Sequence, residues 1–342
     1  MKKKISAALA ACMALLLISS CSLGGNGDTN AGSSNEPEEP VDINYPLDFE
    51  GVYIEQMPER VVSLSPALTE IICELGYEDR LVGRTDYCDY PASVSALPAV
   101  GTPVMLDTDQ IAALEPDLII MQAPPTNDAL IGMQQTGAAI VTLPRAYDLA
   151  STGELYAKVF TLMEGAQVGV DKGEQYKTAF AGRISALSLA VERAVAAMED
   201  APDYTGAYIV DTYSIAATPD TYEGKLLAVL GLENAAAEGV NWQFSHEKLI
   251  EAKPYILLCA SDIDVEDLAD NKRLGSLGAV KNDRAYAVNS VIIERQGPRL
   301  ADELERLARE IYPDLAIDSL VSQPESDEPE QEQSSQDASS QD

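Results

Sequence analysis

The sequence predicts an α/β protein built from two Rossmann-like lobes with parallel sheets, joined by one long bridging α-helix. Strand and helix patterns alternate over residues 60–144, and the same rhythm returns over residues 205–312. Between these halves, large apolar side chains recur at the spacing of one helix face. Roughly 270 residues separate the two polar chain ends, which is more than one compact core usually takes. Two lobes and a connecting helix account for the whole pattern.

The first half opens with an apolar strand over residues 60–65 that leads into a helix. Ser65 is suited to be the N-cap of this helix, Pro66 its first residue, and Gly76 the residue that closes it. A second strand follows over residues 80–85. A helix between two apolar strands favours a parallel arrangement of the strands.

Three further elements complete the first lobe. Asp107 is a candidate N-cap, and Gln110 three residues later gives the form of a capping box. Apolar strands are expected over residues 117–122 and 138–144, with a helix over residues 126–136 between them. The alternation indicates a parallel sheet that is covered by helices.

The strongest periodic signal lies between the two halves. Its apolar residues step by four, four, three, four, four and three, which is one continuous face of an α-helix. A helix over residues 171–198 would be about 40 Å long. A heptad-like stripe also suits a coiled coil, but contacts along two lobes explain it as well. The residues of the stripe are Tyr176, Phe180, Ile184, Leu187, Val191, Val195 and Met198.

The second half repeats the order of the first. "LEPDLIIM" in the first half corresponds to "AKPYILLC" in the second, each with a helix end, a proline and an apolar strand. The expected elements are strands over 207–212, 255–260 and 284–289, and helices over 224–231, 245–252 and from Pro298. The predicted segments are a signal peptide 1–20, a linker 21–50, a first lobe 51–150, a connecting segment 151–203, a second lobe 204–318 and a polar tail 319–342.

The N-terminus has the features of a lipoprotein signal. Three lysines precede an apolar run that is short for a membrane span, and small residues stand directly before Cys21. This arrangement resembles the bacterial lipobox, in which the cysteine becomes the lipid-carrying N-terminus; an ordinary secretory signal is the alternative. Two acyl chains would hold the protein on the extracytoplasmic face of the membrane. Residues 22–50 and the tail are polar and acidic, which is typical of flexible segments.

Charge and cysteine content exclude several classes of protein. Without the acids of the two polar ends and the signal lysines, 42 acids stand against 20 bases, so no basic footprint for nucleic acid exists. Cys73, Cys88 and Cys259 show no CxxC spacing, so they define no disulfide framework; a Cys73–Cys88 bridge stays open. The chain lacks the GxSxG, GxGxxG, P-loop and HExxH motifs of common enzymes.

Several segments together carry a resemblance to a known family. "RVVSLSPALTEIICELGYEDRLVGRTDYCDYP", "ALEPDLII", "NWQFSHEKLIEAKP", "AVKNDRAYAVN" and "RQGPRLADELERLAREIYPD" closely resemble the iron-siderophore and vitamin B12 class of ABC-transporter substrate-binding proteins. The resemblance extends over about residues 58–313 and keeps the order of the motifs. It implies two Rossmann-like lobes bridged by one helix, a ligand in the cleft between them, and delivery to a permease with a cytoplasmic ATPase. We expect a monomeric, lipid-anchored receptor.

The loop "RTDYCDYP" at residues 84–91 poses a choice between a metal site, a nucleophile and a cleft lining. Transition-metal sites need several imidazoles or thiolates, and His246 is the single histidine of the chain. A nucleophilic Cys88 would need a neighbouring base, and none is evident. We therefore expect no metal site, no catalytic residue and no cofactor; the ligand implied by the resemblance is a corrinoid or a ferric siderophore. Free zinc or manganese would need a different donor set.

The expected cleft residues follow the strands of the predicted sheets. Ligands of open α/β sheets bind at the carboxyl ends of the strands. Arginines there suit carboxylate or catecholate oxygens, and aromatic rings suit a flat chelate. Each arginine could equally lie on the surface, and each aromatic ring could serve packing. The candidates are Ser65, Pro66, Arg84, Tyr87, Arg145, Tyr147, Tyr213, Trp242 and Arg295.

The resemblance also implies one acidic docking residue for the permease on each lobe. "SHEKL" puts Glu247 in the first turn of a helix capped by Ser245, and "PPTNDALIG" puts Asp128 at a helix start in the first lobe. Acids are favoured at helix N-termini in any case, so a purely local role is the alternative. An extracytoplasmic α/β enzyme, or a tethered adhesion or signalling module, is the other functional hypothesis.

Overall fold

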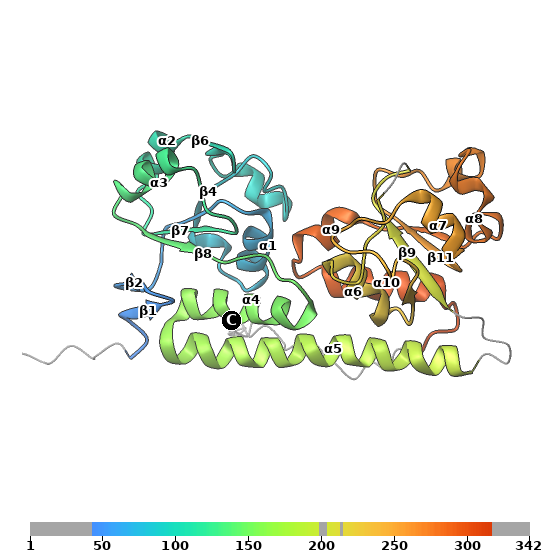
Figure 1. Cartoon of the computed structure of the whole chain (residues 1–342). Coiled ribbons are helices and arrows are strands. Elements are labelled where there is room, and N and C mark those ends of the chain that lie inside the picture. Colours follow the sequence, from blue (N-terminus) through green and yellow to red (C-terminus); the bar gives the residue numbers. More distant parts are fainter. Residues whose placement is uncertain (1–42, 198–203, 213–214, 317–342) are drawn as a thin grey trace, which may run out of the picture. The chain divides into compact units, whose positions relative to one another are not determined.

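The computed structural model describes residues 43–197, 204–212 and 215–316. The first lobe contains a sheet of four parallel strands in the order β4-β3-β7-β8 (Figure 1). These strands are β3 (Val61–Ser63), β4 (Leu81–Arg84), β7 (Leu118–Met121) and β8 (Ala139–Thr142). All four lie within the segments that the sequence predicts as strands.

Alternate residues of each strand enter different cores, because successive side chains of a strand point to opposite faces of the sheet. Val61 and Leu118 belong to the core that contains α1 (Pro66–Glu74). Val62 and Ile119 belong to a second core, with Ile111 and Met133 from the helices α2 (Thr108–Ala113) and α3 (Asn127–Gln134). Helices therefore cover both faces of the sheet, as a parallel sheet requires.

The helix starts of the first lobe carry the caps that the sequence predicts. The side chains of Ser65 and Asp107 accept hydrogen bonds from backbone N–H groups in the first turns of α1 and α2. Thr126 caps α3 in the same way. Gly76 follows α1 with a φ of +83°, a left-handed conformation that favours glycine. The local signals therefore set where these helices begin and end.

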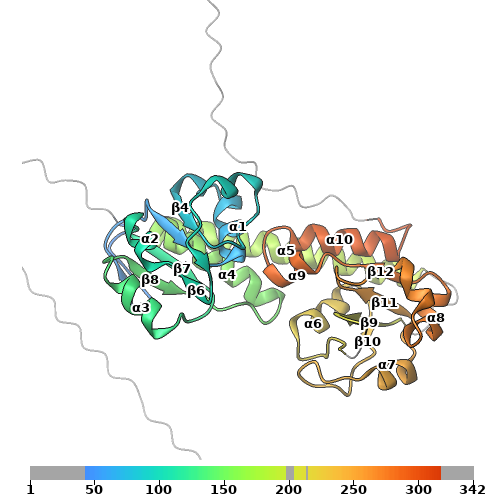
Figure 2. The same ribbon diagram turned by 90° about the horizontal axis from the view of Figure 1, so that it is seen from above.

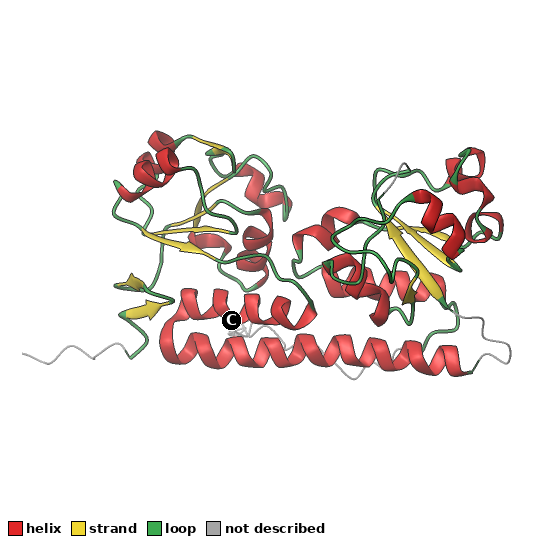
Figure 3. Cartoon of the chain, in the orientation of Figure 1, coloured by secondary structure: helices red, strands yellow, loops and turns green. Residues whose placement is uncertain are grey.

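The second lobe repeats the sheet, with four parallel strands in the order β10-β9-β11-β12. Figure 3 shows strands in yellow and helices in red in both lobes. The helix α9, which precedes the predicted C-terminal helix, is an element that the sequence prediction lacks. The elements of this lobe are β9 (Thr205–Ile209), α6 (Tyr222–Val229), β10 (Glu233–Asn234), α7 (His246–Ala252), β11 (Ile256–Cys259), α8 (Gly278–Lys281), β12 (Ala285–Ala287), α9 (Ser290–Arg295) and α10 (Leu300–Ile311).

The long helix is α5 (Val170–Ala196), and a second helix, α4 (Leu149–Glu164), packs along it (Figure 1). The sequence prediction treats the residues of α4 as part of a connecting segment without naming this helix. A Cβ on Gly173 would lie 2.8 Å from the backbone of Ala157, so glycine permits the close approach of the two helices.

The apolar stripe of α5 is packed and not exposed. Tyr176 and Phe180 each pack edge-on against Tyr156 of α4. Leu187 and Val191, further along, are fully buried in the core that also contains residues of α6 and α10. Figure 2 shows α10 beside α5. The stripe therefore serves both lobes, which removes the coiled-coil interpretation; Met198 lies outside the described residues.

The short elements require one correction. Part of the expected linker 21–50 is folded, because β1 (Leu47–Phe49) pairs with β2 (Val52–Ile54) and buries Leu47 and Phe49. Among the described residues, no helix combines the length and the apolar character that a membrane span needs. The other short elements of the described segments are two hairpin strands, four 3₁₀-helices and one π-helical segment. The strands are β5 (Gly101–Thr102) and β6 (Met105–Leu106), the 3₁₀-helices are η1 (Glu78–Arg80), η2 (Ala92–Ala96), η4 (Glu266–Asp270) and η5 (Leu274–Ser276), and the π-helical segment is η3 (Gly165–Gly169).

Candidate functional site

The carboxyl ends of the first-lobe strands carry a polar group of side chains. Ser65, which follows β3, donates a hydrogen bond through its hydroxyl to Oε1 of Gln122, which follows β7, at 2.8 Å. Among the described residues, Nε2 of Gln122 is a buried donor without an acceptor. Pro66 is partly exposed beside them. The sequence hypothesis omits Gln122, although it is the last residue of a predicted strand and so lies at its carboxyl end.

Arg84 has a structural role that the sequence does not indicate. Its guanidinium donates to the backbone oxygens of Thr85, Val94 and Ser95 at 3.0, 2.8 and 3.1 Å. These bonds hold η2 against the end of β4. They use three of the five N–H groups of the guanidinium, so the expectation that Arg84 meets a ligand stays a prediction. Its surroundings favour a role in positioning the loop that follows.

Three tyrosines near the strand ends present much of their surface to solvent. The exposed fractions are 57% for Tyr87, 43% for Tyr90 and 68% for Tyr147. The guanidinium of Arg299 lies 3.8 Å from the ring centre of Tyr90. The amine of Lys225 lies 5.3 Å from the ring of Tyr147 and donates to its carbonyl at 2.7 Å. Exposed aromatic rings accompanied by cations provide faces for a planar or anionic ligand.

Arg295 is the centre of a charged group shared by the two lobes. From the end of α9, its Nη1 donates to Glu70 of α1 at 2.8 Å and to Asp89 of the 84–91 loop at 2.6 Å. Its Nη2 donates to the carbonyl of Tyr87 at 3.3 Å. Arg299 binds the same Glu70 through two bonds of 3.0 and 2.7 Å. Two guanidinium groups of the second lobe thus hold one carboxylate of the first.

The burial of these groups differs. The side chain of Glu70 is 1% exposed, that of Arg295 15% and that of Asp89 66%. The hydrogen bond from Arg295 lowers the pKa of Asp89 below its ordinary value. Burial lowers the pKa of Arg295, but its bonds to Asp89 and Glu70 outweigh this and raise it. Asp89 and Arg295 are therefore charged at neutral pH. With Glu70 and Arg299, the group contains two carboxylates and two guanidiniums.

Neighbouring residues clamp the second-lobe segment 294–299 to the first lobe. The side chain of Gln296 both donates to and accepts from the backbone of Ala146, at 2.8 and 2.9 Å. Arg145 donates to the carbonyl of Glu294. A Cβ on Gly297 would lie 2.9 Å from Oε2 of Glu70, so a larger residue would collide with the carboxylate. The structure thus brings Tyr87, Arg145 and Arg295 together, with Tyr147 two residues from Arg145.

The remaining aromatic candidates are not part of this group. Trp242 belongs to the second lobe, where its ring packs edge-on against Tyr208 at 6.4 Å and its backbone N–H donates to the hydroxyl of Thr218 at 3.0 Å. Tyr213 lies outside the described residues. No described contact joins Trp242 to Arg295 or to the exposed tyrosines of the first lobe.

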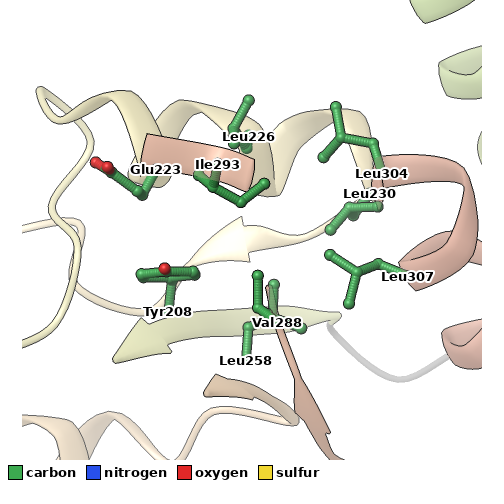
Figure 4. Close-up of a pocket in the computed structure, with 9 residues that line it drawn as sticks. All are labelled: Tyr208, Glu223, Leu226, Leu230, Leu258, Val288, Ile293, Leu304 and Leu307. Atoms are coloured by element: carbon green, nitrogen blue, oxygen red, sulfur yellow. The ribbon is translucent and has the colours of Figure 1, made fainter. Parts of the chain in front are cut away.

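A cavity in the interior of the second lobe is too small for a chelate. Its volume is about 10 Å³, the space of a single water molecule. Tyr208 and Glu223 lie at one end of it, and the remainder of the lining is aliphatic (Figure 4). The aliphatic residues are Leu226, Leu230, Leu258, Val288, Ile293, Leu304 and Leu307. This cavity is part of the core of the lobe, and a ligand of the expected size must bind elsewhere.

The three cysteines that the structure describes form no disulfide. Cys73, Cys88 and Cys259 are free thiols. Burial raises the pKa of Cys73 and of Cys259 to about 12, so both stay protonated and inert at neutral pH. Cys88 is buried against the hydroxyls of Thr69 and Thr85. In the described segments, no three His, Cys, Asp or Glu residues are grouped as a metal site would require.

The two expected docking acids occupy equivalent local positions. Asp128 lies in the first turn of α3, and Glu247 in the first turn of α7, whose N-cap is Ser245 as predicted. Both residues are exposed. Each carboxylate is placed where the positive end of the helix dipole favours a negative charge.

Comparison with known proteins places this architecture in a family. The Periplasmic binding protein family model matches residues 61–291, and the chain belongs to this family. The uncharacterized ABC transporter substrate-binding lipoprotein YvrC of Bacillus subtilis is 27% identical over 323 residues, covering 92% of this chain and 99% of that protein. A cobalamin-binding protein of Halobacterium salinarum is 24% identical over 281 residues, covering 76% of this chain and 71% of that protein.

Solved structures agree on the fold. A periplasmic heme-binding protein from Pseudomonas aeruginosa superposes with a TM-score of 0.64 at 22% identity, covering 76% of this chain and 95% of that chain. The resemblance seen in the sequence is therefore confirmed. The protein is an extracytoplasmic substrate-binding protein of the ABC-transporter type, which binds a small molecule and serves a permease, and it is not an enzyme.

Proposed function

We propose that this protein captures a chelated metal, either a corrinoid or a ferric siderophore, between its two lobes and delivers it to an ABC permease. The observation that carries the proposal is the group formed by Arg295 and the exposed Tyr87 and Tyr147, at loops where both lobes contribute residues. The cobalamin-binding relative from Halobacterium salinarum supports a corrinoid ligand.

The chemistry of these side chains suits a large ligand that is flat in part and anionic in part. Tyrosine rings offer apolar faces for a macrocycle or a catecholate, and Arg295 offers hydrogen-bond donors for its oxygen atoms. Arg145 is a second cation beside the same segment. Trp242, and Tyr213 outside the described residues, are proposed as further contacts from the second lobe. With His246 as the single histidine, a bare transition metal lacks sufficient ligands.

Binding measurements on the purified protein test the ligand class. We expect cyanocobalamin or a ferric tricatecholate to bind with micromolar or tighter affinity in calorimetry, accompanied by a change in its visible absorbance. Free Zn²⁺ and Mn²⁺ should bind at least about a hundredfold more weakly, because the protein has too few imidazole and thiolate ligands. Tight binding of a free metal without any response to a chelate would refute the proposal. Haemin serves as the comparison among planar chelates.

Lipid anchoring through Cys21 is the second part of the proposal. Cys21 lies outside the described residues; the lipobox-like residues before it and the lipoprotein YvrC support the anchor. We expect Cys21→Ala to move the protein from the membrane fraction to the soluble extracytoplasmic fraction while leaving the affinity for the chelate unchanged. Retention in the membrane fraction would show that another segment attaches the protein. In solution, the protein without its signal is expected to be a monomer by light scattering.

Docking to the permease is the third part. Asp128 and Glu247 are proposed to pair with basic residues of the two permease subunits, one pair for each lobe. Two separated ion pairs fix orientation as well as encounter rate, since charges at a rim act mainly on association and register. We therefore expect the two carboxylates to act in delivery of the ligand to the permease and not in ligand binding.

A further inference from the structure

Arg295 has two carboxylate partners that differ in their access to water. Nη1 of Arg295 donates one bond to Glu70 and another to Asp89. Glu70 is 1% exposed and belongs to a helix, whereas Asp89 is 66% exposed and belongs to a loop. A buried charge pair is costly to break, while an ion pair with an exposed carboxylate contributes little to stability. The first partner is therefore permanent and the second can exchange.

Glu70 alone does not balance the positive charges of the two arginines that bind it. Arg299 binds both oxygens of Glu70, so the single charge of Glu70 already has one guanidinium in a bidentate pair. Arg295 is the second guanidinium on the same carboxylate. Glu70 therefore neutralises one of the two cations, and Asp89 supplies the remaining negative charge. If Asp89 left, the group would carry one uncompensated positive charge.

We propose that Asp89 is an internal competitor for the anionic part of the ligand, which binds to Arg295 by displacing the Asp89 carboxylate. This inference rests on the proposed function, because it assumes that the chelate binds at Arg295. An anion added to the group as it stands would give it a net negative charge in a protein that is already strongly acidic. Exchange with Asp89 keeps the group neutral and leaves the buried pairs with Glu70 intact.

The exchange has a consequence for the 84–91 loop. Arg295 also donates to the carbonyl of Tyr87, two residues before Asp89, and Arg299 covers the ring of Tyr90, the next residue. Loss of the Asp89 bond removes the strongest tie between this loop and the second lobe, since charged hydrogen bonds exceed neutral ones. Ligands with a phosphate or carboxylate that reaches Arg295 can make this exchange, while neutral analogues must leave Asp89 in place.

Asp89→Asn tests the proposal, with Asp86→Asn as the control of equal charge change in the same loop. Asparagine keeps an oxygen that can accept a bond from Arg295, but it competes less well because it has no charge. We expect Asp89→Asn to lower the Kd of cyanocobalamin, whose nucleotide loop carries a phosphodiester, by about two- to fivefold. The Kd of dicyanocobinamide, which lacks the phosphodiester, should stay within about 1.5-fold, as should both values for Asp86→Asn.

The outcomes separate this inference from the proposed function. If the wild-type protein binds cyanocobalamin and Asp89→Asn leaves its Kd unchanged or raises it, Asp89 is not a competitor, although the receptor function stands. An equal gain for cobinamide would also overturn the inference, because it would show an effect unrelated to the anionic group. If wild type binds neither corrinoid, the same comparison is made with an anionic ferric tricatecholate. Absence of binding there removes the proposed function itself. Thermal melting of each variant verifies that it is folded.

Discussion

The sheets of the two lobes have the same strand order, but the loops where the lobes meet carry side chains of opposite charge. In each, the second strand of the sheet lies at the edge, followed by the first, third and fourth, all parallel. At the boundary, however, the first lobe supplies carboxylates, Glu70 and Asp89, whereas the second supplies Arg295, Arg299 and Lys225. The backbone architecture is repeated, but the charges are complementary.

The two lobes therefore differ in the charged residues of their loops and not in the order of their strands. The strands β7 and β11 are alike in the two lobes, because all four residues of each are apolar and buried. The charged residues of the boundary group could not be exchanged, because Glu70 and Asp89 bind guanidiniums of the other lobe. Changes in equivalent positions of the two lobes should therefore have unequal effects.

The largest effect is expected from reversing the docking charges. Glu247→Arg should abolish ligand uptake and transporter-stimulated ATP hydrolysis, because like charges would face each other at the permease. Asp128→Arg should have a smaller effect, since the shorter Asp side chain holds its partner less closely. Reconstitution with the cognate permease and ATPase in liposomes measures both, and ligand affinity is the control, which should stay within a few-fold. Full uptake by the double variant would exclude these residues as the docking pair.

The next largest effect is expected at the charged boundary. Glu70→Gln removes the buried charge that two guanidiniums share, and we expect a loss of about 3 kcal/mol in the free energy of unfolding. This lies at the low end for a broken buried pair because Arg295 and Arg299 retain some access to water. Asp79→Asn, at an exposed position of the same lobe, should change stability by less than about 0.5 kcal/mol. Urea denaturation of both variants makes the comparison, and equal stability would mean that the boundary is not held by this charge.

A smaller effect is expected from adding one methyl group at the boundary. Gly297→Ala would place a Cβ 2.9 Å from Oε2 of Glu70. We expect it to cost about 1–2 kcal/mol, because the carboxylate cannot move away without losing its bonds to Arg299. Gly182→Ala in α5 has open space around its Cβ and should instead stabilise the protein by about 0.5–1 kcal/mol. Thermal melting that ranks the two substitutions in the reverse order would contradict the described packing.

The smallest effect concerns a single titration in the second lobe. Burial raises the pKa of Glu223 above its ordinary value of 4.5, so the folded state binds this proton more tightly than the unfolded state. The stabilisation of the folded state by this bound proton is complete below pH 4.5 and is lost as the pH rises through the pKa of Glu223 in the folded state. Glu223→Gln should therefore raise Tm by about 2 °C at pH 7 and leave it nearly unchanged at pH 4. A Tm difference that does not depend on pH would show that the carboxylate is not the cause.

The sequence by itself determined the local elements. The strands of both sheets other than β10, the caps Ser65, Asp107 and Ser245, and the face of the long helix follow from side-chain type and spacing, which act within a few residues. The sequence prediction placed the start of the first lobe at residue 51, which is too late. It missed the strand Leu47–Phe49 because this short apolar segment stands among turn residues and acids.

Only the tertiary structure decided the partners of the polar groups. Glu70 and Arg295 lie 225 positions apart along the chain, and no local pattern could pair them. Arg84, predicted as a ligand contact, also donates to three nearby carbonyls that a loop of different shape would not present. Spacing fixes which face of an element is apolar because that depends on backbone geometry alone. The bonds of a charged side chain depend on which distant groups the fold brings within 3 Å, which only the assembled chain defines.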